Sequence, residues 1–157
     1  MEKRQENAYN KESLADIINN MLRMDDLLRL SRARLDDAKA LQSGSRNHGG
    51  IYLSGYAVEL ALKARICIAL SWDGYPSNSK EFRNYQSFKT HDFDVLLHLS
   101  GLELEVKTNP EVSVHWSILA EWNPEARYEP LDSVTEENAK NMIMAVEKMV
   151  EHIWKKS

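Results

Sequence analysis

Cysteine, proline and glycine are scarce in this 157-residue chain, which contains one, four and six of them respectively. The single cysteine, Cys67, excludes a disulfide within the chain. So low a count is typical of a reducing compartment, and the N-terminal residues 1–7 lack the apolar character of a secretory signal. We therefore expect a cytoplasmic protein.

An excess of positive charge is also missing. The formal net charge is -4 at pH 7, which does not favour general attraction to nucleic acid, although a local basic patch is compatible with it. The sequence has no phosphate-binding glycine loop, CxxC pair or HExxH motif. The two histidines nearest to each other, His91 and His98, would lie about 10 Å apart along a helix axis. We therefore expect no metal site and no cofactor.

The longest apolar stretch is IYLSGYAVELALKARICIAL, residues 51–70. It is long enough to cross a membrane, but its three charged residues, Glu59, Lys63 and Arg65, would be unfavourable in lipid. Its leucines and alanines favour helix over strand, and apolar residues cover nearly the whole circumference of such a helix. The stretch predicts the central helix of a soluble helical core, and we expect no membrane association.

Glu59 and Lys63 lie four residues apart on this predicted helix, in the order that favours an ion pair within one helix. Two interpretations remain open. The pair is either a half-buried structural pair that neutralises itself, or a polar feature that faces a cleft or a partner. The first is the more common role of such pairs.

Apolar residues at helical spacing predict further elements on both sides of the central helix. In chain order these are a surface helix over 24–42, a short helix around 93–99, a helix over 111–122 and a last helix after a capping box at 133–136. Residues 42–50 predict a turn, and 71–90 a long loop. We expect an all-α, up-and-down bundle of four to five helices.

The chain divides into a polar N-terminal extension, residues 1–23, and one domain over residues 24–157. Within the extension, Ser13 is a candidate helix cap, and Leu14, Ile17 and Ile18 would form the apolar side of a short helix. The remaining length is sufficient to bury a core.

Four segments, in this order, resemble the HEPN superfamily of small helical proteins: RLSRARLDDAKAL, YLSGYAVELALKA, THDFDVLLHLS and WNPEARYEP. The similarity runs from about Met24 to the C-terminus. The resemblance implies a bundle of four or five helices, which is often a homodimer and frequently has a minimal nucleotidyltransferase as partner. Members of the superfamily divide into metal-independent ribonucleases, many acting as toxins or in phage defence, and non-catalytic forms that bind a nucleotide or a partner.

The sequence departs from the catalytic pattern of that superfamily, in which Arg is followed by four to six residues and then His. One residue separates Arg46 from His48, and seven separate Arg83 from His91. The family spacing implies an imidazole that exchanges the 2′-hydroxyl proton and a guanidinium that stabilises the charged phosphorus centre. We therefore expect a non-catalytic protein, and Arg83 with His91 is the pair to test if the chain is a nuclease.

Seven residues that coincide with these segments are candidates for a ligand site: Glu59, Lys63, His91, Asp92, Trp122, Arg127 and Tyr128. One hypothesis gathers them near one end of the central helix. Arg127 and Lys63 would then meet a phosphate, and Trp122 or Tyr128 would stack on a base.

The alternative assigns the same residues to structure. Trp122 and Tyr128 would be core aromatics, and Arg127 would tie the irregular connection before the last helix to an acidic residue, Glu59 or Asp92. The pair His91-Asp92 would cap the short helix that follows it.

Three functions therefore stay open. The favoured one is a non-catalytic HEPN-like module that acts with a nucleotidyltransferase-type partner or binds a nucleotide or RNA, in a toxin–antitoxin or defence-like context. The second is a metal-independent endoribonuclease with a non-standard Arg/His pair. The third is a purely structural, dimeric adaptor. The missing catalytic spacing favours the first.

Overall fold

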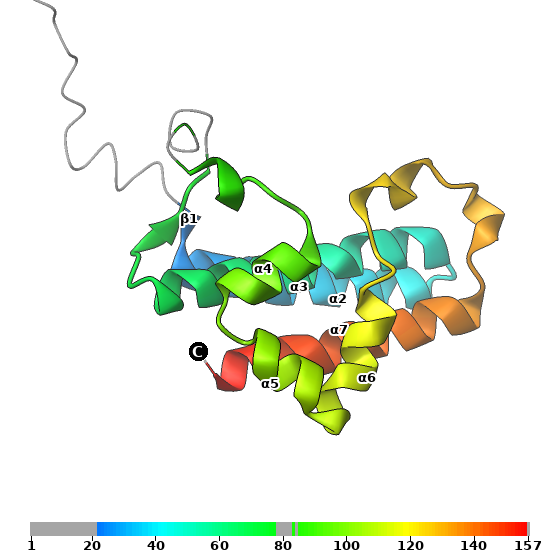
Figure 1. The fold of residues 1–157 in the computed structure, drawn as a ribbon. Coiled ribbons are helices and arrows are strands. Elements are labelled where there is room, and N and C mark those ends of the chain that lie inside the picture. Colours follow the sequence, from blue (N-terminus) through cyan, green and yellow to red (C-terminus); the bar gives the residue numbers. More distant parts are fainter. Residues whose placement is uncertain (1–21, 78–82, 84, 157) are drawn as a thin grey trace, which may run out of the picture.

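The computed structural model describes residues 22–77, 83 and 85–156. Helices dominate this part of the chain, and the predicted all-α bundle is confirmed (Figure 1). The described elements are, in chain order, β1 (Leu22–Arg23), α2 (Met24–Ser43), α3 (Asn47–Ala69), β2 (Gly74–Tyr75), η2 (Gln86–Phe88), α4 (Phe93–Leu99), α5 (Glu103–Thr108), α6 (Pro110–Leu119), η3 (Pro124–Tyr128), η4 (Leu131–Ser133) and α7 (Glu136–Lys155). The short helix predicted around Ser13 lies outside the described residues.

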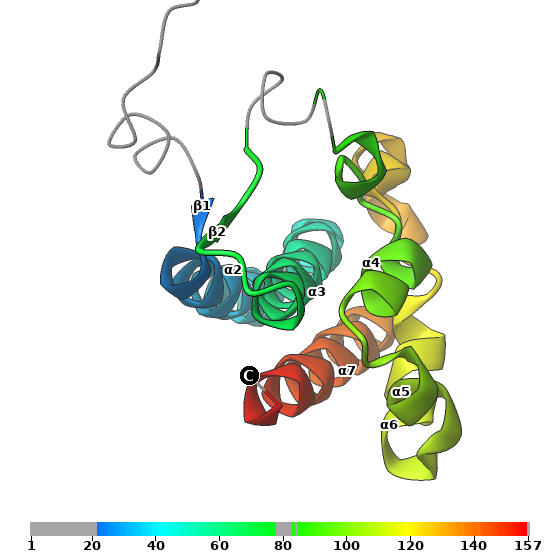
Figure 2. The same cartoon turned by 60° about the vertical axis from the view of Figure 1, so that its left-hand side comes forward.

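Helices α2 and α3 form a hairpin, and α7 lies beside both of them, while α4, α5 and α6 cover one side of this group (Figure 2). The hairpin is tight because small residues of α3, such as Ala57 and Ala61, are fully buried. Its two helices are also joined by a hydrogen bond that the buried Ser31 hydroxyl donates to the Ala57 carbonyl, at 2.6 Å. This bond gives the buried Ser31 hydroxyl the partner that a polar group needs in the interior.

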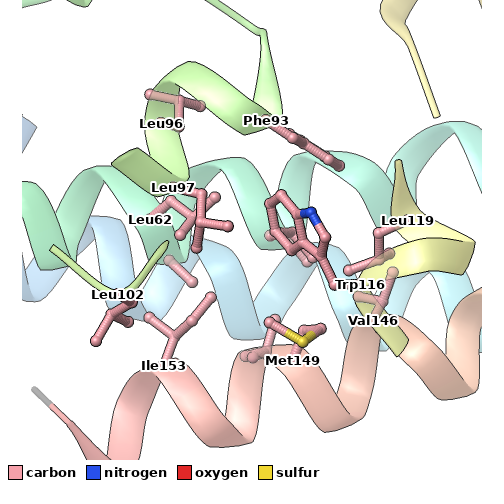
Figure 3. Packing of buried hydrophobic residues seen from close by; sticks show 14 of the residues in the cluster. Leu62, Phe93, Leu96, Leu97, Leu102, Trp116, Leu119, Val146, Met149 and Ile153 are labelled. Carbon is pink, nitrogen blue, oxygen red and sulfur yellow. The ribbon is translucent and has the colours of Figure 1, made fainter. Parts of the chain in front are cut away.

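The core lies between α3, α4, α6 and α7. Leu62 of α3, Leu96 and Leu97 of α4, and Met149 and Ile153 of α7 converge there and are fully buried (Figure 3). Five such side chains together remove several hundred Å² of apolar surface from water, which is the main stabilising term of a bundle of this size. Within the described part of the chain, no helix has both the length and the apolar character needed to cross a bilayer.

Several boundaries differ from those that the sequence predicts. α3 begins at Asn47 rather than 51, so the turn before it is only a few residues long. Gly49 and Gly50 therefore belong to the first turn of the helix. A Cβ at Gly50 would lie 3.1 Å from the Ala38 carbonyl oxygen, so this glycine permits close helix packing rather than a loop conformation.

The last helix begins two residues later than predicted. Thr135, not Ser133, is its N-cap, and Asn138 completes the capping box: Asn138 N donates to Thr135 Oγ1 at 3.1 Å, and Thr135 N donates to Asn138 Oδ1 at 3.3 Å. The helix predicted over 111–122 ends at Leu119, and the structure adds the short α5 before it.

Candidate functional site

Four residues of α3 lie along one line of the helix: Tyr52, Tyr56, Glu59 and Lys63. Successive spacings of four, three and four residues place them on the same side, and we call them the α3 polar line. The rings of Tyr52 and Tyr56 meet edge to face with centroids 5.3 Å apart, and their hydroxyl oxygens are 3.2 Å from each other. The line thus begins with two paired phenol groups and ends with an ion pair.

Glu59 is the buried centre of this line. It is only 4% exposed, yet both carboxylate oxygens have partners: Lys63 Nζ donates to Oε1 at 2.6 Å, and His91 Nδ1 lies 2.8 Å from Oε2. The predicted ion pair with Lys63 is therefore confirmed, and a histidine from the segment before α4 joins it. Two partners satisfy a carboxylate that would otherwise be strongly destabilising in the interior.

Lys63 is directed inward rather than toward solvent. Its side chain is 13% exposed, and its Nζ lies 5.2 Å from the centre of the Tyr75 ring, in addition to its contact with Glu59. These two contacts hold the ammonium inside the protein. The geometry fits the structural interpretation of Lys63 better than a direct phosphate contact.

His91 presents the opposite situation. Its side chain is 57% exposed, although its Nδ1 is held by the buried Glu59 carboxylate. A neutral imidazole that donates from Nδ1 to a carboxylate keeps Nε2 as an acceptor, and a protonated one keeps it as a donor. The Glu59 contact thus fixes the ring and leaves Nε2 for a second partner. The next residue, Asp92, caps α4 by accepting from Val95 N at 3.1 Å, as one of the sequence interpretations proposed.

Trp122 connects the segment after α6 to α3. It is 7% exposed, stacks on Phe93 with centroids 5.0 Å apart and an interplanar angle of 9°, and meets Tyr56 edge to face at 5.3 Å. A Cβ built on Gly55 would fall inside the Trp122 indole, so the absence of a side chain there makes this docking possible. Trp122 is therefore a core aromatic, as the structural interpretation had it, and not a free stacking platform.

Arg127 and Tyr128 come from η3, which Trp122 anchors. The guanidinium lies 4.6 Å from the Tyr128 ring centre, donates from Nη1 to the Pro124 carbonyl at 3.0 Å and has Glu125 within 3.4 Å. Its ion-pair partner is thus local, and not Glu59 or Asp92. Tyr128 is 73% exposed, so it is not a core aromatic.

The guanidinium also lies close to the two tyrosines of α3. Hydrogen bonding to the Tyr128 hydroxyl and, to a smaller extent, to that of Tyr52 raises the pKa of Arg127 above its usual value. Burial and the hydrogen bond to Tyr52 raise the pKa of Tyr56 to about 12, while the positive charge of Arg127 acts in the opposite direction. At neutral pH this group therefore contains the guanidinium cation of Arg127 and the protonated phenol of Tyr56.

A pocket of about 350 Å³ opens beside His91. Its lining combines aromatic side chains with polar ones, chiefly Phe93, Trp116, Trp122, His91, Asp92 and Asp94. We call it the His91 pocket. His91, which contacts Glu59 of the α3 polar line, also lines this pocket, and so does Trp122, which anchors η3. The pocket and the α3 polar line are therefore neighbours.

The structure thus joins Glu59, Lys63 and His91 directly, and it places Asp92 and Trp122 around the adjoining pocket. Arg83 is exposed, and residues 78–82 and 84 beside it lie outside the described residues, so its pairing with His91 stays a prediction. Among the described residues, no group of three or more His, Cys, Asp or Glu side chains is arranged to hold a metal ion. His98 instead has its Nδ1 2.6 Å from Glu103.

The sequence hypothesis missed Tyr52 and Tyr56. The signal was present, because both lie within the predicted helix over residues 51–70, on the same helical line as Glu59 and Lys63. Comparison with protein-family models, with curated proteins and with solved structures found no match for this chain. The HEPN resemblance accordingly enters below as a proposal.

Proposed function

We propose that the protein is a non-catalytic, HEPN-like binding module that holds a phosphate group of a nucleotide or of RNA. The observation that carries the proposal is the meeting of four hydrogen-bonding groups on one side of α3: the hydroxyls of Tyr52 and Tyr56, the imidazole of His91 and the guanidinium of Arg127. The two hydroxyls and the guanidinium donate to phosphate oxygens, and the imidazole donates from Nε2 in its protonated form.

Several properties of these groups support an anion rather than a cation as ligand. Tyr56 and Arg127 are donors at neutral pH, because their ordinary pKa values already lie well above it and both are raised further. Glu59, the one carboxylate on this line, is buried and already accepts from Lys63 and His91, so its charge is offset. The side that faces solvent therefore presents mainly donors.

Titration with a nucleoside monophosphate, followed by calorimetry, tests this proposal. Arg127→Gln removes the fixed charge, and we expect affinity to fall by about tenfold or more, the usual contribution of a charge-assisted hydrogen bond. The melting temperature should be unchanged, because the contacts of Arg127 within the protein are exposed.

Arg34→Gln is the matched control, since Arg34 is a surface arginine of α2 that pairs only with Asp37 among the contacts described. That variant should bind as the unaltered protein does. Equal affinity of the Arg127 variant and the unaltered protein would contradict the proposed site, and so would binding lost only together with the fold.

A second candidate function, metal-independent cleavage of RNA, is favoured by one observation, the contact between His91 and the buried Glu59. A carboxylate that fixes one nitrogen of a histidine prepares the other nitrogen to act as a base. His91 Nε2 would remove the 2′-hydroxyl proton, the resulting oxygen would attack phosphorus, and the 5′-oxygen would leave with a proton. The products would be a 2′,3′-cyclic phosphate and a free 5′-hydroxyl.

Incubation of the protein with mixed-sequence RNA in the presence of a chelator tests this second function. Three variants, His91→Ala, Arg83→Ala and Arg127→Ala, separate the roles of the imidazole and of the two candidate cations. Cleavage that is lost in His91→Ala while the melting temperature is kept would establish the nuclease. Intact RNA after long incubation at high protein concentration would leave the binding module as the function to pursue.

The wider context is part of the same proposal. The HEPN resemblance supports a cytoplasmic homodimer with a nucleotidyltransferase-type partner, in a toxin–antitoxin or defence-like system. Light scattering measures the oligomeric state, and co-purification with a neighbouring nucleotidyltransferase measures the partnership. A monomer that retains no such protein would reduce the proposal to nucleotide or RNA binding alone.

A further inference from the structure

The His91 pocket lies where the remainder of a phosphate-bearing ligand would extend. His91 lines this pocket and also belongs to the four hydrogen-bonding groups beside α3, together with Tyr52, Tyr56 and Arg127. The volume of about 350 Å³ falls within the range of small-molecule sites in proteins. A ligand held by its phosphate at Tyr52, Tyr56 and Arg127 can therefore place a further group in this pocket.

The lining of the pocket contains both aromatic side chains and hydrogen-bond acceptors. Phe93, Trp116 and Trp122 supply aromatic surface, and the carboxylates of Asp92 and Asp94 supply acceptors. A flat ring with N–H groups at its edge satisfies both requirements, because the ring covers apolar atoms while its edge donates to carboxylate oxygens. Phosphate itself would be repelled by these carboxylates.

The carboxylates are not free charges that need a cation. Asp92 Oδ1 accepts from Val95 N at 3.1 Å, and Asp94 Oδ1 lies 3.5 Å from Lys107 Nζ. Each therefore already has part of its charge offset, and each retains acceptor capacity for an additional donor. This favours a neutral group with N–H donors over a fully charged ammonium or guanidinium.

We propose that the His91 pocket is the base subsite of the nucleotide-binding site and selects nucleobases that carry an exocyclic amino group. The inference rests on the proposed function, since it requires that the phosphate is bound by Tyr52, Tyr56 and Arg127. Asp92 and Asp94 accept from the amino group, while Phe93 and Trp122 contact the ring. Adenine, guanine and cytosine fit this description, and hypoxanthine and uracil, which lack the amino group, do not.

Two pairs of monophosphates vary the amino group. GMP differs from IMP only in the 2-amino group, and CMP differs from UMP in having an amino group in place of a carbonyl and an acceptor in place of a donor at N3. We expect GMP and CMP to bind about tenfold more tightly than IMP and UMP respectively, the effect of one hydrogen bond to a charged acceptor. Calorimetric titration of all four measures the two ratios.

The double substitution Asp92→Asn and Asp94→Asn tests the acceptors. Asparagine also caps helices well, so α4 is retained, and the melting temperature checks this. We expect the GMP/IMP ratio to fall toward one. Arg127→Gln is the complementary variant, in which all four affinities should fall together and the ratios should stay.

The outcomes separate the two proposals. Equal affinities for GMP and IMP, with both weakened by Arg127→Gln, would overturn the base subsite and leave the phosphate site standing. A GMP/IMP ratio that persists in the folded double Asn variant would overturn the role of the two carboxylates, and the base subsite with it. No binding of any of the four at millimolar concentration would overturn both.

Discussion

Two sides of α3 differ in the residues that they present to their neighbours. Toward α2, the helix presents alanines that are fully buried, and a single hydrogen bond from Ser31 to the Ala57 carbonyl accompanies the apolar packing. Toward α4 and η3, it presents the polar line from Tyr52 to Lys63, which is held by ion pairs and ring contacts. The first side is closed by neighbouring helices along its length, and the second is covered only by short segments.

This difference separates stability from binding within one helix. Apolar packing on the α2 side gains free energy from area alone, and any small side chain of suitable shape serves it. The polar side needs particular groups at particular positions, because Glu59 is satisfied only while Lys63 and His91 both reach it. Substitutions can therefore be chosen that affect one side and not the other.

The largest effect is expected at Glu59. Glu59→Ala leaves the ammonium of Lys63 largely buried without its carboxylate, and we expect the free energy of unfolding to fall by on the order of 3 kcal/mol. The double variant Glu59→Leu and Lys63→Leu should recover most of this loss, because it removes both charges. Urea denaturation of the three proteins measures both changes.

Glu136 and Lys140 form the matched control for that experiment. They have the same order and the same spacing of four residues on α7. Their side chains are exposed, however: Glu136 is 62% exposed and Lys140 is 60% exposed. Glu136→Ala should lower stability by less than about 1 kcal/mol. Similar losses at Glu59 and Glu136 would show that burial of the α3 pair has no energetic role.

Gly55→Ala should have the next largest effect. The added methyl group would occupy the space of the Trp122 indole, so Trp122 and the start of η3 must shift. We expect a loss of about 2 kcal/mol, the usual result of overpacking, together with weaker nucleotide binding as Arg127 moves with η3. Denaturation and calorimetric titration measure the two losses.

Gly49→Ala, one and a half turns earlier on the same helix, serves as its control. A Cβ there would meet only the end of the flexible Leu41 side chain, at 3.4 Å. Alanine also favours helix over glycine, so stability should be equal or slightly higher. If both substitutions were neutral, the close docking of Trp122 on α3 would be wrong.

Alkaline pH tests Cys67, which is fully buried and lies four residues after Lys63 on the same line of α3, beside Tyr75. Burial raises the pKa of the Cys67 thiol from 9.0 to about 11. The unfolded chain therefore loses this proton at lower pH than the folded protein does. The resulting contribution to stability is fully present below pH 9 and is lost as the pH rises toward 11, at a rate of at most about 1.4 kcal/mol per pH unit.

Unfolding in urea at pH 8 and at pH 10 measures this loss. Cys67→Ala should reduce the difference between the two pH values, because the variant has no thiol to ionise at this position. Part of the difference reaches Tyr75, because the Cys67 thiolate contributes to the raised pKa of that tyrosine and is absent from the variant. A difference of the same size in the variant would mean that Cys67 ionises as easily in the folded protein as in the unfolded chain.

The smallest effect is expected at the open side, from Tyr56→Phe. The ring and its contact with Trp122 remain, and only the hydroxyl that pairs with Tyr52 is lost. We expect nucleotide affinity to fall by about fivefold, the value of one neutral hydrogen bond, with little change in melting temperature. Tyr85→Phe, at an exposed loop position, should change neither quantity.

Long helices with a clear apolar period could be predicted from the sequence, whereas short elements could not. α7 buries residues at a clear helical spacing. α3 is apolar nearly all round, so its helix was predicted from the length of the apolar stretch and from its leucines and alanines. α5 buries only Val106, and one residue defines no period. The two-residue strands β1 and β2 likewise carry no alternation that a sequence could reveal.

The candidate site was predictable where it depends on spacing within one helix. The pair of Glu59 with Lys63 follows from four-residue spacing, and Tyr52 and Tyr56 would have followed from the same argument. The contact of His91 with Glu59 could not be predicted in this way, because it depends on how the segment before α4 packs on α3. The position of Arg127 depends in turn on Trp122 docking at Gly55, which no local pattern encodes.

The Gly55–Trp122 contact has a consequence for how this chain can vary. Every amino acid that could replace glycine adds at least one carbon in the volume that the indole occupies. A substitution of Gly55 is therefore tolerated only after Trp122 has been replaced by a smaller residue. Conversely, a tryptophan at position 122 requires a glycine at position 55. In an alignment of descendants of this chain, the two positions should change together, and their joint pattern would identify proteins in which η3 reaches the same place.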